Sequence, residues 1–532
     1  MGIPAYFSHI VKQHPGILQK INKKHTIINN LLIDSNSVIY DAVRDMEYSS
    51  SNKNFERELI KKICLKLEEY IKLITPNNEV IIAFDGVAPV AKLEQQRNRR
   101  YKTWFQKQLS TELDSTTEPS WDTTAITPGT TFMASLASEV AKYFSNPKKF
   151  SVQSIIVSSS NEAGEGEHKL FKHIRKNIHN YKDQKTIIYG LDADLIMLTI
   201  NHLPIARNLF LFRETPHFIR SIDKTLDPNS LYMLRIPHLA QAIINKLNNG
   251  NKITKRQEKN RLYDYIFMTF LLGNDFIPHF PALNIRTYGI DHLMDAYAAT
   301  LGNTDKNITD GKIIYWSNLR LLISNLQENE HQFIEMEYER RNRQAKRRFP
   351  NNTKEEKDQR FQAIPLIDRK VELYINPYED FWQERYYKEL FDIEPSEANI
   401  KNICVNFLEA LEWTIKYYSH KCPDWRWCYK YNYPPLLQDL IRYIPYFETD
   451  FITEVEKNPV DKYVQLAYVL PRDSLSLLPS NIREHLLTKH PNWYHNNCNF
   501  QWAYCKYFWE SHVILPDICI DTLEKDITIL AK

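Results

Sequence analysis

The first 290 residues alternate short apolar runs with longer amphipathic stretches, and this alternation most constrains the fold. The runs are NLLID (30–34), EVIIAFD (79–85), SIIVSSS (154–160), TIIYGLD (186–192) and NLFLFRE (208–214). Buried β-branched runs that alternate with helical patterns are typical of parallel strands covered by helices on both faces. The sequence therefore predicts an α/β fold with a mostly parallel twisted sheet flanked by helices.

The character of the chain changes twice beyond this region. Residues 305–370 contain the run ERRNRQAKRRFPNNTKEEKDQR (339–360), which is charged and poor in large apolar side chains. Such a run is typical of an exposed helix or linker. Residues 371–532 are rich in Trp and Tyr at helical spacing. We predict an α/β domain over 1–304, a charged helical linker over 305–370, and a mainly helical module over 371–532 packed on the first domain.

Charge and cysteine usage limit the class of protein. The 68 basic and 65 acidic residues leave a net charge of +3, so any affinity for nucleic acid must come from local clusters. The seven cysteines form no CxxC pair, which favours reduced thiols over a disulfide framework or a zinc site. No apolar run approaches the roughly 18 residues of a membrane span. We expect a soluble intracellular protein without membrane contact, cytoplasmic first and nuclear as the alternative.

Carboxylates recur where the predicted strands end. Asp34, Asp85 and Asp192 each close a strand, and the carboxyl ends of parallel strands face one ligand-binding crevice. Four more acids are near in sequence or in pattern: Glu165, Glu167, Asp194 and Asp275. A single Asp after a strand is more often a helix cap or turn residue, and glutamates at a helix start also suit its dipole.

Seven acids converging on one crevice need another explanation than a single acid does. Unscreened like charges at close range raise one another's pKa or destabilise the fold. Divalent cations remove that conflict. Mg²⁺ prefers hard oxygen ligands, and a pair of such ions stabilises the attacking and leaving oxygens in phosphodiester cleavage. The pattern therefore indicates metal-dependent phosphoryl transfer.

A basic helix face follows Asp85 in the segment GVAPVAKLEQQRNRRYKTW (86–104). At about 100° per residue, one face of this helix presents Lys92, Gln96, Arg99 and Arg100. Guanidinium forks and an ammonium suit a terminal phosphate. A solvated basic face is the alternative, but the position next to Asp85 favours a phosphate site.

The positions of the glycines also point to a site around the candidate metal ligands. The chain has only 12 glycines, so those that remain are expected where no other residue fits. Five of them lie within two residues of a candidate metal ligand: Gly86, Gly164, Gly166, Gly190 and Gly273.

Ordered motifs give the chain a specific resemblance. They are MGIPAYF (1–7), IDSNSVIY (33–40), AFDGVAPVAKLEQQRNRR (83–100), ITPGTTFM (126–133), GEGEHKL (164–170), YGLDADLIML (189–198) and LLGNDFIPHFP (271–281). Two later segments are ALEWTIKYYSHKCPDWRWCYKYNYPPLLQDL (410–440) and QLAYVLPRDSLSLLP (465–479). Together they resemble both conserved regions of the Xrn family of 5′→3′ exoribonucleases. The acids alone are shared more widely with flap-endonuclease-like (PIN-type) nucleases.

The resemblance implies roles for individual residues. The metal-binding acids of the family fall on the seven acids above, and its 5′-monophosphate pocket falls on Lys92, Gln96, Arg99 and Arg100. The family clamps the terminal bases between aromatic rings. Tyr40 stands where the family usually has His, and the Trp partner is either Trp425 or Trp427. Core packing is the alternative for the tryptophans, and burial in a helix is the alternative for Tyr40.

The implied activity is a Mg²⁺-dependent, processive 5′→3′ exoribonuclease that degrades single-stranded RNA with a 5′-monophosphate to mononucleotides. Two Mg²⁺ ions are expected, with Mn²⁺ as a substitute. We expect a monomer, with decapping or other RNA-processing enzymes as partners. The chain matches a minimal form without long C-terminal extensions, which would fit either a large DNA virus, with the protein acting in a host cytoplasm, or a protist. The alternatives are a structure-specific DNA or flap-type nuclease and a non-catalytic RNA-binding scaffold.

Overall fold

The structure is a computed structural model that describes most of the chain. The described residues are 3, 5–14, 16–21, 27–113, 120–213, 226–227, 231–455, 457–495 and 497–530. Three residues of the MGIPAYF motif, at positions 1, 2 and 4, lie outside them. Among the described residues, no helix combines the length and the apolar character needed to cross a lipid bilayer.

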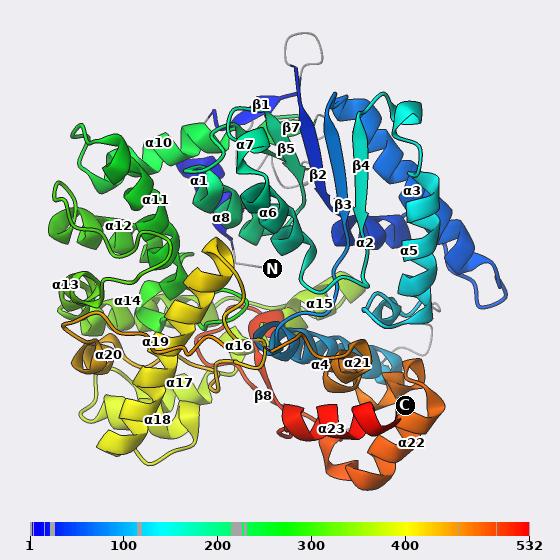
Figure 1. The fold of residues 1–532 in the computed structure, drawn as a ribbon. Coiled ribbons are helices and arrows are strands. Elements are labelled where there is room, and N and C mark those ends of the chain that lie inside the picture. The colour runs from blue at the N-terminus through cyan, green and yellow to red at the C-terminus, as the bar shows by residue number, and fades with distance from the viewer. Residues whose placement is uncertain are drawn as a thin grey trace.

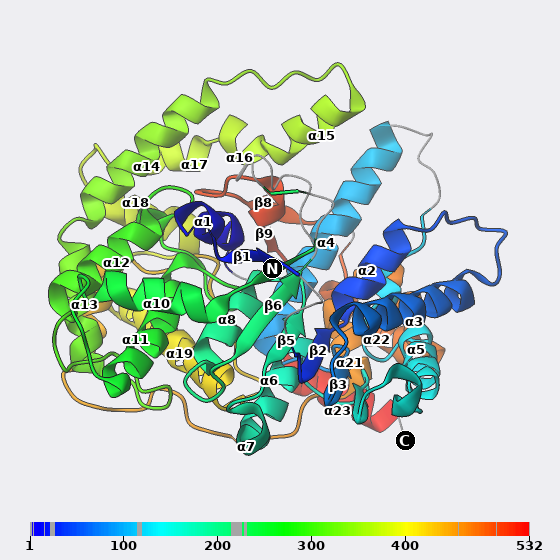
Figure 2. The same cartoon turned by 90° about the horizontal axis from the view of Figure 1, so that it is seen from above.

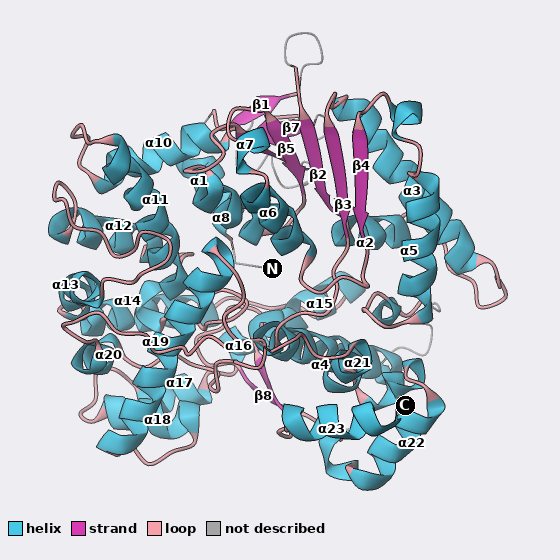
Figure 3. Cartoon of the chain, in the orientation of Figure 1, coloured by secondary structure: helices cyan, strands magenta, loops and turns pink. Residues whose placement is uncertain are grey.

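A seven-stranded sheet forms the centre of the N-terminal part, in the order β1-β7-β6-β5-β2-β3-β4 (Figure 3). Its strands are β1 (Leu18–Lys20), β2 (Asn30–Asp34), β3 (Glu79–Ala83), β4 (Ser154–Ser158), β5 (Thr186–Tyr189), β6 (Leu209–Arg213) and β7 (Tyr232–Leu234). The five strands from β6 to β4 are parallel, while β7 and β1 join the edge antiparallel. All five predicted runs form strands, so the prediction of a mostly parallel sheet is confirmed.

The order of the strands places a crevice next to β2. From β2 the chain runs to β3 and β4 on one side, then crosses back to β5 on the other side. Leu32 of β2 therefore pairs with Ile81 of β3 and with Ile188 of β5. A reversal of this kind is where open α/β sheets bind their ligands, beyond the carboxyl ends of the strands.

Helices cover both faces of the sheet because successive side chains of each strand point to opposite faces. Leu32, with its strand neighbours, packs against α6 (Gly166–Lys176) and α8 (Ala193–His202). Leu31 faces the other way, toward α2 (Asn36–Arg44), α3 (Phe55–Ile74) and α5 (Thr131–Tyr143). Figure 1 shows α6 and α8 on one side of the sheet and α3 and α5 on the other.

The rest of the described chain is mainly helical, as predicted. Helices α1 (Tyr6–Gln13), α4 (Val90–Leu113) and α7 (Ile178–Tyr181) also belong to the N-terminal part. The helices after β7 are α10 (Ile236–Leu247), α11 (Lys255–Thr269), α12 (Gly289–Thr300), α13 (Trp316–Gln327), α14 (Glu330–Ala345), α15 (Lys354–Gln362), α16 (Ile364–Ile367), α17 (Lys370–Ile375), α18 (Trp382–Phe391), α19 (Glu397–Ser419), α20 (Leu437–Tyr443), α21 (Lys462–Val469), α22 (Ser480–Lys489) and α23 (Ile520–Leu530). Between α22 and α23, β8 (Asn499–Gln501) and β9 (His512–Ile514) form a hairpin.

One apolar core runs from the sheet into the helical part. Leu32 and Ile188 belong to the same cluster of buried side chains as Trp413 and Tyr418 of α19. A second junction forms where Leu93 of α4 packs among side chains of α21 and α23. Figure 1 shows α4 below the sheet, alongside α21. The boundaries proposed at 304 and 370 stay predictions.

Residues 305–370 contribute two buried arginines to an ion-pair network, despite the charge of this segment. Arg341 of α14 donates to Glu372 (2.5 Å), and Arg369 donates to the same carboxylate (2.6 Å). Arg341 also donates to the carbonyl of Cys505 (2.9 Å). All three charged side chains are at most 3% exposed, so this network ties α14 to α17 and to the segment that follows β8.

Candidate active site

The strand-end aspartates lie at the crevice beside β2. Asp34 is the last residue of β2 and is 5% exposed. Asp85 follows β3, and Asn36 of α2 donates to its carboxylate (2.5 Å). Asp192 follows β5 as the residue before α8 and is exposed. Asp194 lies in the first turn of α8 and is 3% exposed.

The start of α6 brings two glutamates to the same place. Glu165 directly precedes α6 and Glu167 lies in its first turn, and both are buried. Gly166 stands between them, and its N–H donates to the Asp85 carboxylate (2.7 Å). A β-carbon at this position would lie 2.5 Å from Oδ1 of Asp34. A side chain at position 166 would therefore displace the Asp34 carboxylate or move α6 away from β2.

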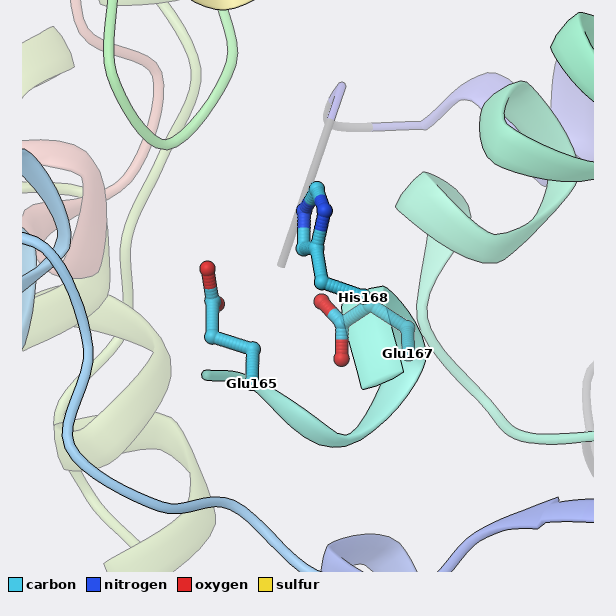
Figure 4. A group of neighbouring side chains, drawn as sticks. All are labelled: Glu165, Glu167 and His168. Atoms are coloured by element: carbon cyan, nitrogen blue, oxygen red, sulfur yellow. The ribbon is translucent and has the colours of Figure 1, made fainter. Parts of the chain in front are cut away.

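Carboxylates at the start of α6 form two groups that could hold cations. Ligand atoms of Asp34, Asp85 and Glu167 lie within 4.8 Å of one another, as do those of Glu165, Glu167 and His168. Figure 4 shows the last three side chains projecting into one space from the beginning of α6. His168 was not predicted, although it lies within the GEGEHKL motif.

The electrostatics of the cluster show mutual repulsion. Burial first, and then the neighbouring Asp85, Asp192 and Glu165, raise the pKa of Asp34 well above its usual value. Burial and the Glu165 charge do the same to the pKa of Glu167. Oδ1 of Asp34 is buried and has no hydrogen-bond partner among the described residues. Buried carboxylates with raised pKa values and an orphaned oxygen fit a site for divalent cations.

Lys92 of α4 bridges two of these acids. Its Nζ lies 2.5 Å from Glu165 and 2.7 Å from Asp275. Burial raises the pKa of Glu165 despite the Lys92 charge, whereas for Asp275 the Lys92 ammonium, acting against burial, helps to hold the pKa well below its usual value. The two carboxylates in turn raise the pKa of Lys92 against the effect of burial. The sequence predicted Lys92 as a phosphate ligand, and here its ammonium also joins Asp275 to the acid cluster.

Two tyrosines of α19 close the site from the helical part. Tyr417 donates to Glu165 (2.9 Å) and Tyr418 donates to Asp194 (3.0 Å). Burial and these carboxylates raise the pKa of both phenols well above the usual value, so both stay protonated donors. The imidazole of His168 stacks on Tyr417 with ring centroids 3.8 Å apart. The sequence carried no signal for these contacts, which join residues more than 220 positions apart.

The remaining residues of the predicted phosphate face lie farther along α4. Gln96 is buried, and its Oε1 has no partner among the described residues. Arg99 is exposed. Arg100 donates to Thr127 of the ITPGTTFM motif (2.6 Å), and burial lowers the pKa of its guanidinium to about 10. A buried amide and two guanidinium groups on the helix that carries Lys92 suit a bound phosphate.

The aromatic candidates differ in their surroundings. Tyr40 lies on α2, is half-buried against the core, and is close enough to Arg100 to influence its pKa. The Trp427 ring stacks on Trp413 (5.4 Å between centroids), and its Nε1 donates to Glu409 (3.3 Å). Trp425 is half-buried, and its carbonyl accepts from the N–H of Val90 at the start of α4 (3.0 Å). The structure therefore places Trp427 against the core and Trp425 beside α4.

Two protein-family models match the chain. The model of the XRN 5′-3′ exonuclease N-terminus matches residues 1–215, and the model of the Xrn1 helical domain matches residues 256–373 and 368–519. The first match covers strands β1 to β6 and six of the seven acids, and the second covers Asp275 and α19.

Related proteins share this range of the chain. The 5′-3′ exoribonuclease 1 of Saccharomyces cerevisiae is 26% identical over 91% of the chain and 40% of its own length. The 5′-3′ exoribonuclease 2 homolog of Drosophila melanogaster is 26% identical over 90% of the chain and 65% of its own length. Human 5′-3′ exoribonuclease 1 is 28% identical over 92% of the chain and 31% of its own length. The chain spans less than two thirds of each of these proteins.

Proposed function

Since the chain belongs to the Xrn family, we propose that it is a 5′→3′ exoribonuclease acting on single-stranded RNA with a 5′-monophosphate. The proposal rests above all on the position of Lys92, whose Nζ contacts Glu165 and Asp275 from the helix that also bears Arg99 and Arg100. The acids and the basic face thus meet at one residue. Such an arrangement suits cleavage one nucleotide away from a recognised end.

The acid cluster would hold divalent cations, and we propose two Mg²⁺ ions that Mn²⁺ can replace. The candidate ligands are Asp34, Asp85, Glu165, Glu167, Asp192, Asp194 and Asp275. When bound, such ions supply Lewis acidity for hydrolysis of the phosphodiester bond. The protein's own contribution is orientation. Tyr417 and Tyr418 hold Glu165 and Asp194 by hydrogen bonds, and Gly166 lets Asp34 and Asp85 approach the start of α6.

The 5′-phosphate would bind along α4. Gln96 offers a buried amide whose N–H groups can donate to a phosphate oxygen, and Arg99 offers an exposed guanidinium. Arg100 is oriented by Thr127. Lys92 would lie between this phosphate and the acids. These groups would match the charge of one terminal phosphate, and we expect the site to select a monophosphate over a cap or triphosphate.

The terminal bases would stack between Tyr40 and Trp425. Tyr40 comes from α2, close to Arg100, and Trp425 is held beside the start of α4 by its bond from Val90. Trp427 is committed to Trp413 and Glu409, which favours Trp425 as the second ring. Stacking of this kind tolerates any base, and it would keep the RNA bound between successive cleavages, so that mononucleotides are released processively.

We further propose a monomeric enzyme that acts in the cytoplasm on RNA made accessible by a decapping or other RNA-processing enzyme. All seven cysteines are free thiols in the structure, which agrees with a reducing compartment. The preference for a 5′-monophosphate requires an earlier reaction that exposes this end.

The test compares RNAs of one sequence carrying a 5′-monophosphate, a 5′-hydroxyl or a cap, with Mg²⁺. We expect rapid degradation of the monophosphate only. Equal degradation of all three would remove the phosphate-site assignment. The matched variant Asp192→Ala/Asp194→Ala should bind the RNA and leave it intact, and full activity in that variant would remove the metal-site assignment.

A further inference from the structure

A basic ridge lies at the end of α14 and the start of α15. We define the basic ridge by six exposed side chains: Arg343, Lys346, Arg347, Arg348, Lys354 and Lys357. Residues 343–360 contain seven basic and three acidic residues, a net charge of +4, whereas the whole chain carries +3. Positive charge is therefore concentrated here rather than spread over the surface.

The ridge charges lack close ion-pair partners among the described residues. Across the described part of the chain, none of the six side chains makes an ion pair within 4.0 Å or a side-chain hydrogen bond. A basic residue in the last turn of a helix can complement the helix dipole, which accounts for Arg343 alone. Because α14 ends at Ala345, the other five lie outside its last turn. Repulsion among them is a cost that a polyanion would relieve.

The ridge is packed onto the helix that carries the proposed phosphate site. The Phe361 ring of α15 lies 4.5 Å from Phe508, and Phe508 lies 6.2 Å from Phe105 of α4. In the same short helix, Phe508–Glu510, the carbonyl of Trp509 accepts from Lys102 of α4 (2.7 Å). Figure 2 shows α14 and α15 along one edge of the molecule, with the C-terminal half of α4 beside α15.

A cavity connects this junction with the active site. It has a volume of about 830 Å³, and its lining includes Asp275, Arg99 and Trp509. The Trp509 ring lies parallel to the half-buried Tyr507 ring, with centroids 5.9 Å apart, and the Lys506 ammonium lies 4.9 Å from Tyr507. Partly exposed aromatic rings among cations are the usual means of holding single strands without sequence preference.

We propose that the basic ridge binds the phosphate backbone of the single-stranded RNA substrate, 3′ of the nucleotides held at the active site. This inference rests on the proposed function for the identity of the polyanion. The ridge offers flexible, unpaired Lys and Arg side chains at the surface, which match a mobile chain of phosphates rather than a single anion in a pocket. It would keep a long RNA attached while its 5′ end advances.

The experiment measures equilibrium binding in EDTA, which separates binding from cleavage. The variant is Arg343→Gln/Lys346→Gln/Arg347→Gln/Arg348→Gln. The probes are 5′-monophosphorylated RNAs of about 4 and about 20 nucleotides, since single-strand sites span roughly 4–16 nucleotides. The affinity for the long RNA should fall by at least about tenfold near physiological salt. Its slope of log K against log salt should fall by up to about 3, at about 0.7 for each phosphate left without a cation. The short RNA should bind as it does to wild type.

A matched control removes four exposed charges elsewhere: Lys53→Gln/Arg57→Gln/Lys61→Gln/Lys142→Gln, from α3, α5 and the loop before α3. This control should bind both RNAs as wild type does. Unchanged affinity and slope for the long RNA in the ridge variant would overturn the proposal, as would an equal loss in the control. If the wild type binds the long RNA in this way but does not degrade it with Mg²⁺, the proposed function fails and the ridge assignment stands.

Discussion

Tyr418 donates a hydrogen bond to Asp194 over 3.0 Å, although the two residues are 224 positions apart. This contact fixes a carboxylate of the N-terminal sheet region with a phenol from the helical part. Tyr417 does the same for Glu165 (2.9 Å). The acid cluster is therefore completed by α19 and is not a property of the sheet alone.

Replacing Tyr418 with Phe should raise the Mg²⁺ concentration needed for half-maximal activity by about tenfold, because partners that orient a metal ligand typically contribute 10- to 100-fold in metal affinity. The measurement is a Mg²⁺ titration of RNA degradation. Tyr386→Phe is the matched control, since the Tyr386 hydroxyl is also buried but donates to the carbonyl of Pro434 (2.9 Å). It should leave the Mg²⁺ requirement unchanged. An equal requirement in Tyr418→Phe and wild type would remove the orienting role.

Replacing Gly166 with Ala should lower kcat/KM by about 100-fold, because displacing catalytic groups by about 1 Å costs that much. The added β-carbon would lie 2.5 Å from Oδ1 of Asp34, so the Asp34 carboxylate, α6 or β2 must shift. Gly250→Ala is the control, because nothing lies within 4 Å of a β-carbon there and its φ of +76° adds only local strain. The measurement is steady-state kinetics of both variants on 5′-monophosphorylated RNA. Wild-type kinetics in Gly166→Ala would contradict the close approach.

Replacing Lys92 with Met should destabilise the metal-free protein by about 3–5 kcal/mol, the usual effect of removing one member of a buried ion pair. Both partner carboxylates, Glu165 and Asp275, are at most 4% exposed. Cations bound by the same acids should then restore stability. Thermal unfolding in EDTA and in Mg²⁺ should show a larger Mg²⁺-dependent gain for Lys92→Met than for wild type.

Lys102→Met serves as the control for Lys92→Met. The Lys102 ammonium donates to two backbone carbonyls, those of Trp509 (2.7 Å) and Ser511 (2.8 Å), rather than to the acid cluster. Its Mg²⁺-dependent gain should equal that of wild type. The same gain in Lys92→Met as in wild type would show that Lys92 does not share its carboxylates with the cations.

Substitutions of the two tryptophans in the DWRW segment should have different effects, one on activity and the other on stability. Trp425→Ala should lower kcat/KM by roughly 5- to 150-fold with little change in the unfolding midpoint, since one stacked base contributes about 1–3 kcal/mol. Trp427→Ala should mainly destabilise the fold, because Trp427 stacks on Trp413 in the core. Kinetics and thermal unfolding of both variants give the answer. The reverse assignment of effects would identify Trp427 as the stacking ring.

The sheet and the strand-end acids were predictable because both follow from local pattern. Apolar runs such as residues 79–83 form strands wherever they can be buried on both faces. The strand order then brings their carboxyl ends together, so Asp34 and Asp85 meet across β2 and β3. The short strands β1 and β7, which pair with each other antiparallel, were not predicted, since three residues such as LQK (18–20) carry no periodicity.

The contacts that complete the site were not predictable from one sequence. Tyr417 lies in a motif that resembled the family, but nothing local indicates that its hydroxyl meets Glu165. The charge of a segment likewise did not indicate how deeply its side chains are buried. Arg341 lies within a run typical of an exposed helix, yet it is 1% exposed because it pairs with Glu372, which Arg369 also contacts. Both features depend on contacts between residues that are far apart in the sequence.

The most direct test of the proposed activity follows the products from uniformly labelled, single-stranded RNA with a 5′-monophosphate, beside a flap-shaped DNA. With Mg²⁺, we predict that nucleoside monophosphates appear from the first turnover, that no intermediate-length fragments accumulate, and that the DNA flap stays intact. Release of fragments cut at the flap junction, or binding of RNA with no hydrolysis, would contradict a 5′→3′ exoribonuclease.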